Sequence, residues 1–361
     1  MSIKCPIRVL CVFSTLDRGG AESMCMNLYR HIDKNKVQFD FVKHTSKKGA
    51  FEDEIMSLGG RIFEAPRLKV GKIITYCQWW SSFLDNHPEY HVIHGHFFGI
   101  SPVYFSIAKR KKRITIGHSH ISKADRLTKA ILCKFISRTS DYAFACSKLA
   151  GEWIFHDRQF TVLNNAIDSK LFRADAQIAK EVRDEFLLGD NLVIGNVSRF
   201  NLQKNPYGIL EIFCKIHEKC PHSKLLWVGD GPMKEEITEK AKNQGVLPNV
   251  VFTGVRNDVP RLLQAMDAFL FPSFYEGLGI AAVEAQAAGV QTFCSTAVPE
   301  EAGVTELCHF ISLENLDIWA QEISTIPANY LHLDMTEQIK KSGYDIHDTA
   351  VWLQNFYLSI Q

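Results

Sequence analysis

The chain has 361 residues, a length that accommodates two domains of ordinary size. Its composition, 46% apolar and 22% charged, is typical of a soluble globular protein and excludes the disordered and fibrous classes. No apolar stretch reaches the roughly 20 residues of a membrane-spanning helix, and no secretory signal is visible, so we expect a cytoplasmic protein. The ten cysteines form no C-x-x-C pair and are expected in the core rather than in a disulfide or zinc framework.

Charge is distributed unevenly although the net charge is only +1. Residues 1–172 contain 26 Lys and Arg against 15 Asp and Glu, and the remainder contains 15 against 25, so the two parts carry +11 and −10. The basic run 109–113 and the basic, amphipathic segment 123–138 favour peripheral contact with an anionic membrane surface. Attraction between two oppositely charged domains explains the asymmetry equally well. Nucleic acid is not an expected partner, because no recognised binding module accompanies the charge.

Apolar runs rich in Val, Ile and Phe alternate with helical patterns along the whole chain, as is typical of buried parallel strands joined by helices. The expected strands of the first part are Ile7–Phe13, Phe39–Lys43, Arg61–Ala65, His91–Gly95, Ile114–His118, Tyr142–Ser147 and Phe160–Leu163. Those of the second part are Leu192–Ser198, Lys224–Val228, Val250–Gly254, Ala268–Phe271, Thr292–Cys294 and His309–Ser312. The pattern predicts two doubly wound α/β domains, placed at residues 1–172 and 173–344.

Several nucleotide-binding motifs are absent from the sequence. Neither G-x-G-x-x-G nor a G-x-x-x-x-G-K-[ST] phosphate loop is found, which argues against a dehydrogenase and against a P-loop kinase. There is also no Asp-x-Asp pair to hold a divalent cation against a diphosphate. We therefore expect any bound diphosphate to be neutralised by cationic side chains, backbone amides and a helix N-terminus, without a metal ion.

Two post-strand loops of the second domain offer such groups. Arg199 and Lys204 lie five residues apart after one expected strand, where a guanidinium fork and an ammonium can converge on one anion. Farther along, a strand runs through a glycine-rich turn into an apolar helix, a layout that directs free amides at an anion. Glu276 precedes that turn and Glu284 lies on the helix, so the two carboxylates can accept hydrogen bonds from sugar hydroxyls on either side.

These residues, in this order and spacing, resemble the retaining glycosyltransferases of family four. The resemblance extends over nearly the whole chain and also rests on the segments Gly19–Glu22, Gly229–Pro232 and Phe252–Gly254. It implies the GT-B fold, in which two Rossmann-like domains face a cleft and the C-terminal helix, residues 345–361, packs back on the N-terminal domain. The N-terminal domain would bind the acceptor and the C-terminal domain the nucleotide sugar. One departure is Ala166, where the family usually has Gly, so the turn there is expected to differ.

The resemblance also implies roles for individual residues. Arg199 and Lys204 would hold the diphosphate, Glu284 the ribose hydroxyls and Glu276 the hydroxyls of the transferred sugar. The remaining donor contacts would come from backbone at Gly19, Gly20, Val255, Arg256, Gly279 and Ile280. A histidine near the reacting sugar would be His120 or His118, of which His120 fits the motif slightly better.

The expected activity is transfer of a sugar, with its anomeric configuration retained, from a nucleotide diphosphate sugar to an acceptor hydroxyl. UDP is the expected donor nucleotide because of its prevalence in such enzymes. The expected acceptor is a saccharide or a lipid-linked precursor in capsular or exopolysaccharide synthesis, reached from the inner face of the cytoplasmic membrane. A nucleotide-sugar epimerase and a non-catalytic nucleotide-sugar sensor are the alternatives.

Overall fold

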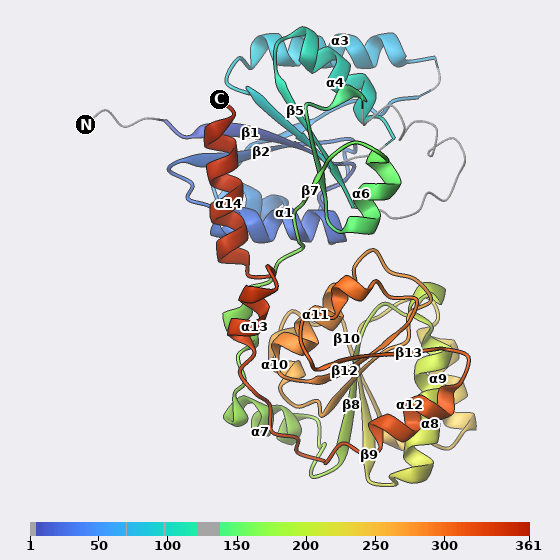
Figure 1. Cartoon of the computed structure of the whole chain (residues 1–361). Helices are drawn as coiled ribbons and strands as arrows, with labels where there is room; N and C mark the ends of the chain where they lie inside the picture. The colour runs from blue at the N-terminus through green and yellow to red at the C-terminus, as the bar shows by residue number, and fades with distance from the viewer. Residues whose placement is uncertain (1–4, 70, 97–98, 121–137) are drawn as a thin grey trace. The chain divides into compact units, whose positions relative to one another are not determined.

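The computed structural model describes residues 5–69, 71–96, 99–120 and 138–361 (Figure 1). The chain divides into two compact units. The N-terminal unit comprises residues 1–167 together with 345–361, and the C-terminal unit comprises residues 168–344. The chain therefore leaves the first unit five residues before the boundary that we placed after residue 172, and it returns to this unit at Asp345.

The N-terminal unit is built on a seven-stranded parallel sheet with the strand order β3-β2-β1-β4-β5-β6-β7. Its strands are β1 (Ile7–Val12), β2 (Val37–Lys43), β3 (Ile62–Glu64), β4 (Val92–Gly95), β5 (Ile114–Ser119), β6 (Tyr142–Ala145) and β7 (Thr161–Val162). Its helices are α1 (Gly20–His31), α2 (Glu52–Ser57), α3 (Ile73–Asn86), α4 (Ser101–Arg110), α6 (Lys148–Phe155) and α14 (Ile346–Ser359).

Alternation along β1 shows why both faces of this sheet are covered. Val9 and Cys11 point into a core shared with α1 and α14, whereas Leu10 and Val12 point into a second core shared with α3 and α4. All four side chains are fully buried. Successive residues of a strand point to opposite faces, so a continuous apolar run requires helices on both.

The C-terminal helix α14 packs on the N-terminal unit, as expected. Ile346, Ala350, Leu353 and Tyr357 lie on one buried face at helical spacing. The Tyr357 hydroxyl lies 2.6 Å from Nδ1 of His94, which ties the end of the chain to β4. At the entry to this helix, the backbone N–H of Ile346 donates to the carbonyl oxygen of Ile167 over 2.9 Å.

The C-terminal unit is built on a six-stranded parallel sheet with the strand order β10-β9-β8-β11-β12-β13. Its strands are β8 (Leu192–Val197), β9 (Ser223–Val228), β10 (Val250–Gly254), β11 (Ala268–Phe271), β12 (Gln291–Ser295) and β13 (Cys308–Ile311). Its helices are α7 (Ala176–Glu185), α8 (Pro206–Lys219), α9 (Lys234–Asn243), α10 (Val259–Leu263), α11 (Ile280–Ala287), α12 (Leu316–Ile323) and α13 (Thr336–Lys341). Short 3₁₀ turns are η1 (Ser169–Phe172), η2 (Leu202–Lys204), η3 (Leu247–Asn249) and η4 (Glu300–Ala302).

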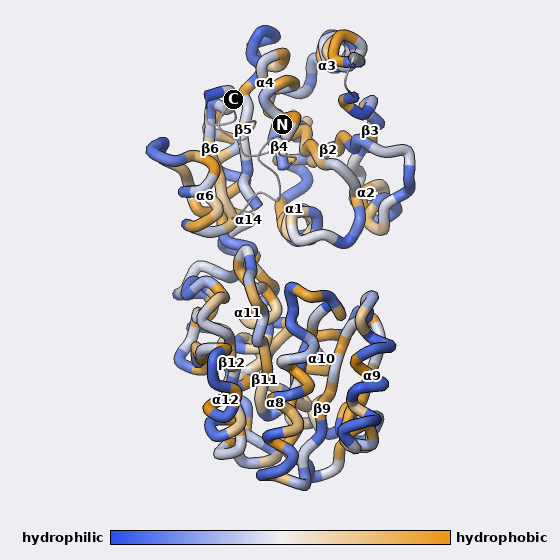
Figure 2. The backbone as a smooth tube through the Cα atoms, turned by 90° about the vertical axis from the view of Figure 1, so that its right-hand side faces the viewer, coloured by the Kyte–Doolittle hydropathy of each residue, from blue (hydrophilic) through white to orange (hydrophobic). Residues whose placement is uncertain are grey.

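Hydropathy follows this layering in the C-terminal unit. The central strand β11 is fully buried and orange in Figure 2, whereas helix α9, rich in Lys and Glu, is mostly blue. Gly195 in β8 has a packing role, because a Cβ there would lie 1.9 Å from the Met266 sulfur. The strand positions expected from the sequence are found within two residues of their observed bounds. None of the described helices is long and apolar enough to span a bilayer.

Two features noted in the sequence have definite structural outcomes. Ala166 is buried, and it is not among the described residues with a positive φ, so this turn has no need of glycine. The basic segment 123–138 lies, except for Arg138, outside the described residues.

Candidate active site

Lys204 and Glu276 meet at the carboxyl ends of two neighbouring strands of the C-terminal unit. Lys204 ends the 3₁₀ turn that follows β8, and Glu276 lies in the loop after β11. The Lys204 ammonium donates a hydrogen bond of 2.5 Å to Oε1 of Glu276 and lies 4.9 Å from the centre of the Phe271 ring. The Lys204 and Glu276 side chains are 20% and 7% exposed, respectively, so the pair is largely desolvated and still reachable.

The two loops that carry this pair are fastened together by polar contacts. Asn205 adopts the left-handed conformation at φ 54°, and its side chain accepts from the Gly208 N–H and donates to the Pro272 carbonyl. Gln203 donates to the Tyr275 carbonyl over 3.0 Å and to Oε2 of Glu276 over 3.4 Å. Since these contacts hold the backbone on both sides of the pair, the geometry of the pair is set before a ligand binds.

Gly279 is the N-cap of helix α11 and has φ 93°, a conformation that L side chains rarely adopt. A Cβ at this position would also lie 3.0 Å from the Phe271 ring and 3.3 Å from a Val298 methyl group. Glycine therefore allows the chain to turn sharply from the β11 loop into the helix. The first amides of α11, at Gly279 and Ile280, then lack intrahelical acceptors, which makes this end of the helix suited to an anion.

Glu284 lies on α11, one turn beyond its start, and is partly buried. Its carboxylate makes no hydrogen bond or ion pair with any residue that the structure describes, and burial raises its pKa to about 7. A desolvated carboxylate with unused acceptor sites is poised to accept hydrogen bonds from hydroxyl groups of a ligand.

The loop after β10 presents backbone rather than side chains. Val255 is 67% exposed, and the Arg256 guanidinium is held by both carboxylate oxygens of Asp258 at 2.8 Å. Gly229, at the end of β9, donates to the Gly254 carbonyl over 2.9 Å, which joins this loop to the neighbouring strand. The Arg256 side chain is thus engaged by Asp258 and lies 3.6 Å from Glu185 of α7, while the neighbouring Val255 is exposed.

Arg199 lies on the same post-β8 loop as Lys204 and has an exposed side chain. Glycine at position 229 keeps this loop close to the next one, because a Cβ there would lie 2.0 Å from the Ser198 carbonyl oxygen. The structure therefore brings Lys204, Glu276 and the α11 N-terminus to one edge of the sheet, with Arg199 nearer the start of the loop that carries Lys204.

In the N-terminal unit, Gly19 and Gly20 form the start of α1 directly after the β1 loop. A Cβ on Gly19 would lie 2.2 Å from Oε2 of Glu22, whereas a Cβ on Gly20 would meet nothing within 4 Å. Burial raises the pKa of Glu22. Of the two glycines, only Gly20 faces open space where a ligand could approach the backbone.

Four histidines stack at the carboxyl ends of β4 and β5. His118 is fully buried, and its Nδ1 lies 3.2 Å from Nε2 of His94. His120 is partly exposed, and its Nε2 lies 2.9 Å from Nδ1 of His96. Burial lowers the pKa of His94 and of His120 to about 3, so all four rings are neutral at physiological pH. Of the two candidates, His120 is the more exposed, and His118 belongs to the core.

Three polar residues that organise these sites carried no signal in our sequence analysis. They are Gln203, Asn205 and His96. The Asn-Pro pair at 205–206 is an N-cap followed by a first-turn proline, and this signature could have identified Asn205. Gln203 and His96 act through partners distant in sequence, so no local pattern reveals them.

Comparison with protein families agrees with this geometry in both units. Residues 18–171 match the model described as Glycosyltransferase Family 4, and residues 178–305 match the model described as Glycosyl transferases group 1. EpsF of Bacillus subtilis, a protein named as a glycosyltransferase without a stated donor, is 31% identical over 97% of this chain and 96% of its own. An Escherichia coli UDP-Gal:α-D-GlcNAc-diphosphoundecaprenol α-1,3-galactosyltransferase is 31% identical over 38% of this chain and 36% of its own.

Solved structures agree with the fold. Anabaena HepE, crystallised with UDP and glucose, superposes with a TM-score of 0.80 over 98% of this chain and 100% of its own, at 17% identity. The lipopolysaccharide outer core galactosyltransferase WaaB superposes with a TM-score of 0.75 over 98% and 99%, at 15% identity. At these identities the likeness establishes the architecture of the two units.

Proposed function

The chain belongs to glycosyltransferase family 4, with the GT-B fold, and we propose that it transfers a sugar from a UDP-sugar to an acceptor hydroxyl with retention of configuration. The observation that carries this proposal is the Lys204–Glu276 pair beside the N-terminus of α11. It offers one cation and free amides to a diphosphate, and carboxylate oxygens to the hydroxyls of a sugar attached to it.

The donor is oriented by groups on both sides of the pair. Lys204, Arg199 and the amides of Gly279 and Ile280 bind the diphosphate, while Glu284 accepts from the ribose hydroxyls. The backbone of Val255 and Arg256 contacts the base. A sugar hydroxyl that donates to Glu276 competes with Lys204 for this carboxylate, so the ammonium can turn toward phosphate.

Catalysis then consists mainly of stabilising the leaving group. As the glycosidic bond to phosphate breaks, negative charge grows on the diphosphate, and Lys204, Arg199 and the α11 amides are already placed to stabilise it. The departing phosphate oxygen accepts the proton of the acceptor hydroxyl on the same face of the sugar, so the configuration is retained without a side-chain nucleophile. The neutral imidazole of His120 is available as a hydrogen-bond partner for the sugar.

The proposed donor nucleotide and acceptor rest on relatives. HepE was crystallised with UDP, and the E. coli relative is named for UDP-Gal and a diphosphoundecaprenol-linked acceptor. A Salmonella typhi relative is named for Vi polysaccharide biosynthesis. We therefore propose a saccharide or lipid-linked acceptor in surface polysaccharide synthesis.

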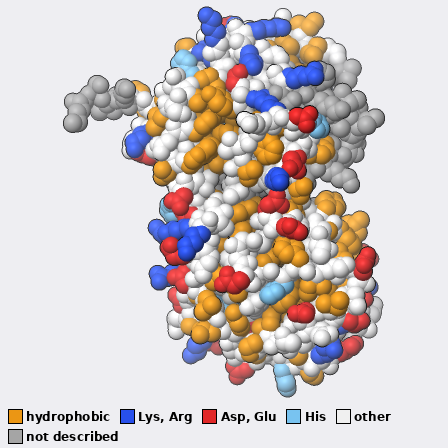
Figure 3. Space-filling view, viewed as in Figure 1, with side chains coloured by type: hydrophobic (Ala, Val, Ile, Leu, Met, Phe, Trp, Pro, Cys, Tyr) orange, Lys and Arg blue, Asp and Glu red, His pale blue; other side chains and the backbone are white. Residues whose placement is uncertain are grey.

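Peripheral contact with an anionic membrane surface is part of the proposal. In the view of Figure 3, Lys and Arg side chains gather over α3 and α4 of the N-terminal unit. In the run 109–113, Lys109 and Lys111 are paired with Asp141 and Asp85, whereas Arg110 and Lys112 are exposed. These two cations can approach a leaflet that holds a lipid-linked acceptor.

A ligand screen followed by product analysis tests the activity. UDP should raise the melting temperature more than GDP or ADP, since a nucleotide at 100 times its Kd adds about 2.7 kcal/mol to the free energy of unfolding. The matching UDP-sugar, incubated with acceptor, should give an α-linked product and free UDP. Interconversion of UDP-sugars without an acceptor would indicate the epimerase instead, and tight binding without turnover would indicate a sensor.

A further inference from the structure

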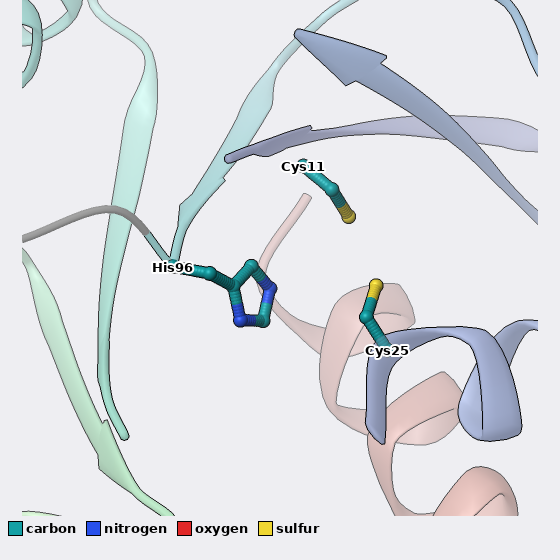
Figure 4. Close-up of side chains that lie close together, drawn as sticks. All are labelled: Cys11, Cys25 and His96. Atoms are coloured by element: carbon teal, nitrogen blue, oxygen red, sulfur yellow. The ribbon is translucent and has the colours of Figure 1, made fainter. Parts of the chain in front are cut away.

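Three buried side chains from separate elements converge in the N-terminal unit. Cys11 lies in β1, Cys25 lies in α1, and His96 follows β4. Their possible ligand atoms, the two sulfurs and one imidazole nitrogen, all lie within 4.8 Å of one another. The three residues are 0%, 2% and 8% exposed. Figure 4 shows both sulfur atoms on the side of the His96 ring that carries one of its nitrogens.

The His96 ring is held in place with one nitrogen unused. It stacks on Phe13, with ring centres 4.5 Å apart and an angle of 6°, and on His94 at 4.2 Å. Its Nδ1 bonds to His120, whereas its Nε2 is buried and has no hydrogen-bond partner among the described residues. A buried polar atom without a partner is costly, so the fixed orientation of this nitrogen toward two thiols calls for an explanation.

Burial decides which charge a ligand at this cluster must carry. Cys11 and Cys25 are shielded from solvent, so two thiolates formed here would need a bound positive charge, and a divalent ion would balance them.

We propose that Cys11, Cys25 and His96 bind one zinc ion, which goes beyond the transferase activity and does not depend on it. Two thiolates and one imidazole are a donor set typical of zinc. Binding replaces two S–H bonds by two Zn–S bonds and releases two protons to solvent, so the charge of the site stays neutral. Zn–S bonds of about 2.3 Å require sulfur atoms roughly 3.8 Å apart, so the side chains need to close by at most about 1 Å.

A second set of donors overlaps with this one and is less suitable. His94, His96 and His118 also place possible ligand atoms within 4.8 Å of one another. However, both nitrogens of His94 are already used, by the Tyr357 hydroxyl and by Nδ1 of His118. A metal bound by the three imidazoles would break those contacts, whereas a metal at the thiols leaves them intact.

Zinc at this place also fixes the proton on His96. If Nε2 ligates the metal, Nδ1 carries the proton and donates it in the hydrogen bond to Nε2 of His120. His120 then carries its own proton on Nδ1. The metal thus acts as a positioning element for His120.

Metal analysis of the untagged, full-length protein tests the proposal. Protein expressed in zinc-supplemented medium and dialysed should contain about one zinc ion per chain. Reconstitution of metal-free protein with Co²⁺ should produce a thiolate-to-cobalt charge-transfer band. The Cys25→Ala variant should lose both the zinc and the band. The matched control is Cys294→Ala/Cys308→Ala, which removes another close thiol pair, with sulfurs 3.9 Å apart, and should keep both.

Three outcomes overturn the assignment. The site is excluded, without any variant, if the wild-type protein binds neither zinc nor Co²⁺ and thiol analysis finds Cys11 and Cys25 as free thiols or as a disulfide. Zinc retained by Cys25→Ala assigns the metal to the histidines instead. If the Cys294→Ala/Cys308→Ala control loses zinc to the same extent, the metal is bound adventitiously by thiols.

Discussion

Lys204 and Glu276, 72 residues apart in sequence, form a 2.5 Å hydrogen-bonded ion pair at adjacent strand ends of the C-terminal unit. The local sequence around either residue does not reveal that these two side chains pair. The sheet order places β8 beside β11, and the loops that follow both strands therefore emerge at the same edge.

Removing either member of this pair should nearly abolish transfer. We expect Lys204→Ala and Glu276→Ala each to lower kcat/KM by roughly 10²-fold or more, because each removes a preorganised group from the reacting centre. Because the two groups are in contact, the double variant should lose much less than the product of the single losses. Steady-state kinetics at varied donor concentration measures all three.

The control for this pair is Lys215→Ala, which breaks an exposed ion pair with Asp317 and should leave the rate unchanged. A Lys204 or Glu276 variant that keeps more than about a tenth of the wild-type kcat/KM would contradict the assigned site.

Glu284 should make stability depend on pH. Its folded pKa of about 7 exceeds the ordinary value of 4.5, so between these values the folded state holds a proton that the unfolded chain releases. The free energy of unfolding should therefore fall as pH rises from 4.5 to 7 and level off above it. Glu284→Gln should weaken this dependence in thermal melts, while the exposed Glu235→Gln should retain it.

The two candidate histidines should respond differently to substitution. His120→Ala should lower kcat with little effect on the melting temperature, because this residue is partly exposed. His118→Ala should destabilise the fold by about 1–3 kcal/mol, since it opens a cavity and leaves Nε2 of His94 without its partner. Denaturant melts and kinetics on both variants separate the roles, and the reverse pattern would assign the sugar-facing role to His118.

Transfer should need no added Mg²⁺ or Mn²⁺. The cationic Lys204 and Arg199 with the α11 amides supply the charge that a divalent ion would otherwise provide at the diphosphate. Rates in buffer stripped of divalent ions should match those with either ion added within about twofold. Strict dependence on added Mg²⁺ or Mn²⁺ would refute the account of the leaving group, and it would leave the proposed zinc site untouched.

Binding to anionic vesicles should depend on the two exposed cations at the C-terminal end of α4, Arg110 and Lys112. Arg110→Glu/Lys112→Glu should weaken sedimentation with phosphatidylglycerol vesicles by roughly tenfold or more, at about 1 kcal/mol per cation lost. Lys219→Glu/Lys242→Glu makes the same charge change in the C-terminal unit and should bind as the wild type does. Equal binding of the wild-type protein to neutral and anionic vesicles would contradict the proposed membrane contact. The charge asymmetry would then be explained by attraction between the domains.

The sequence by itself determined the two doubly wound domains and the identities of the donor-site candidates. Strands buried on both faces are predominantly apolar, so Ala268–Phe271 is visible as a continuous apolar run, and Leu192–Val197 as a run interrupted only by Gly195 and Asn196. Gly279 marks its turn because only glycine readily adopts φ 93° there, and this property is local to the residue.

Only the tertiary structure decided which side chains meet. It separated the buried His118 from the partly exposed His120, because His118 lies within β5 whereas His120 follows its carboxyl end. It brought Cys11, Cys25 and His96 together from three elements, with spacings of 14 and 71 residues that match no metal motif. Contacts between distant segments depend on the order of strands in a sheet and on side-chain packing. A local pattern of residues predicts neither of these.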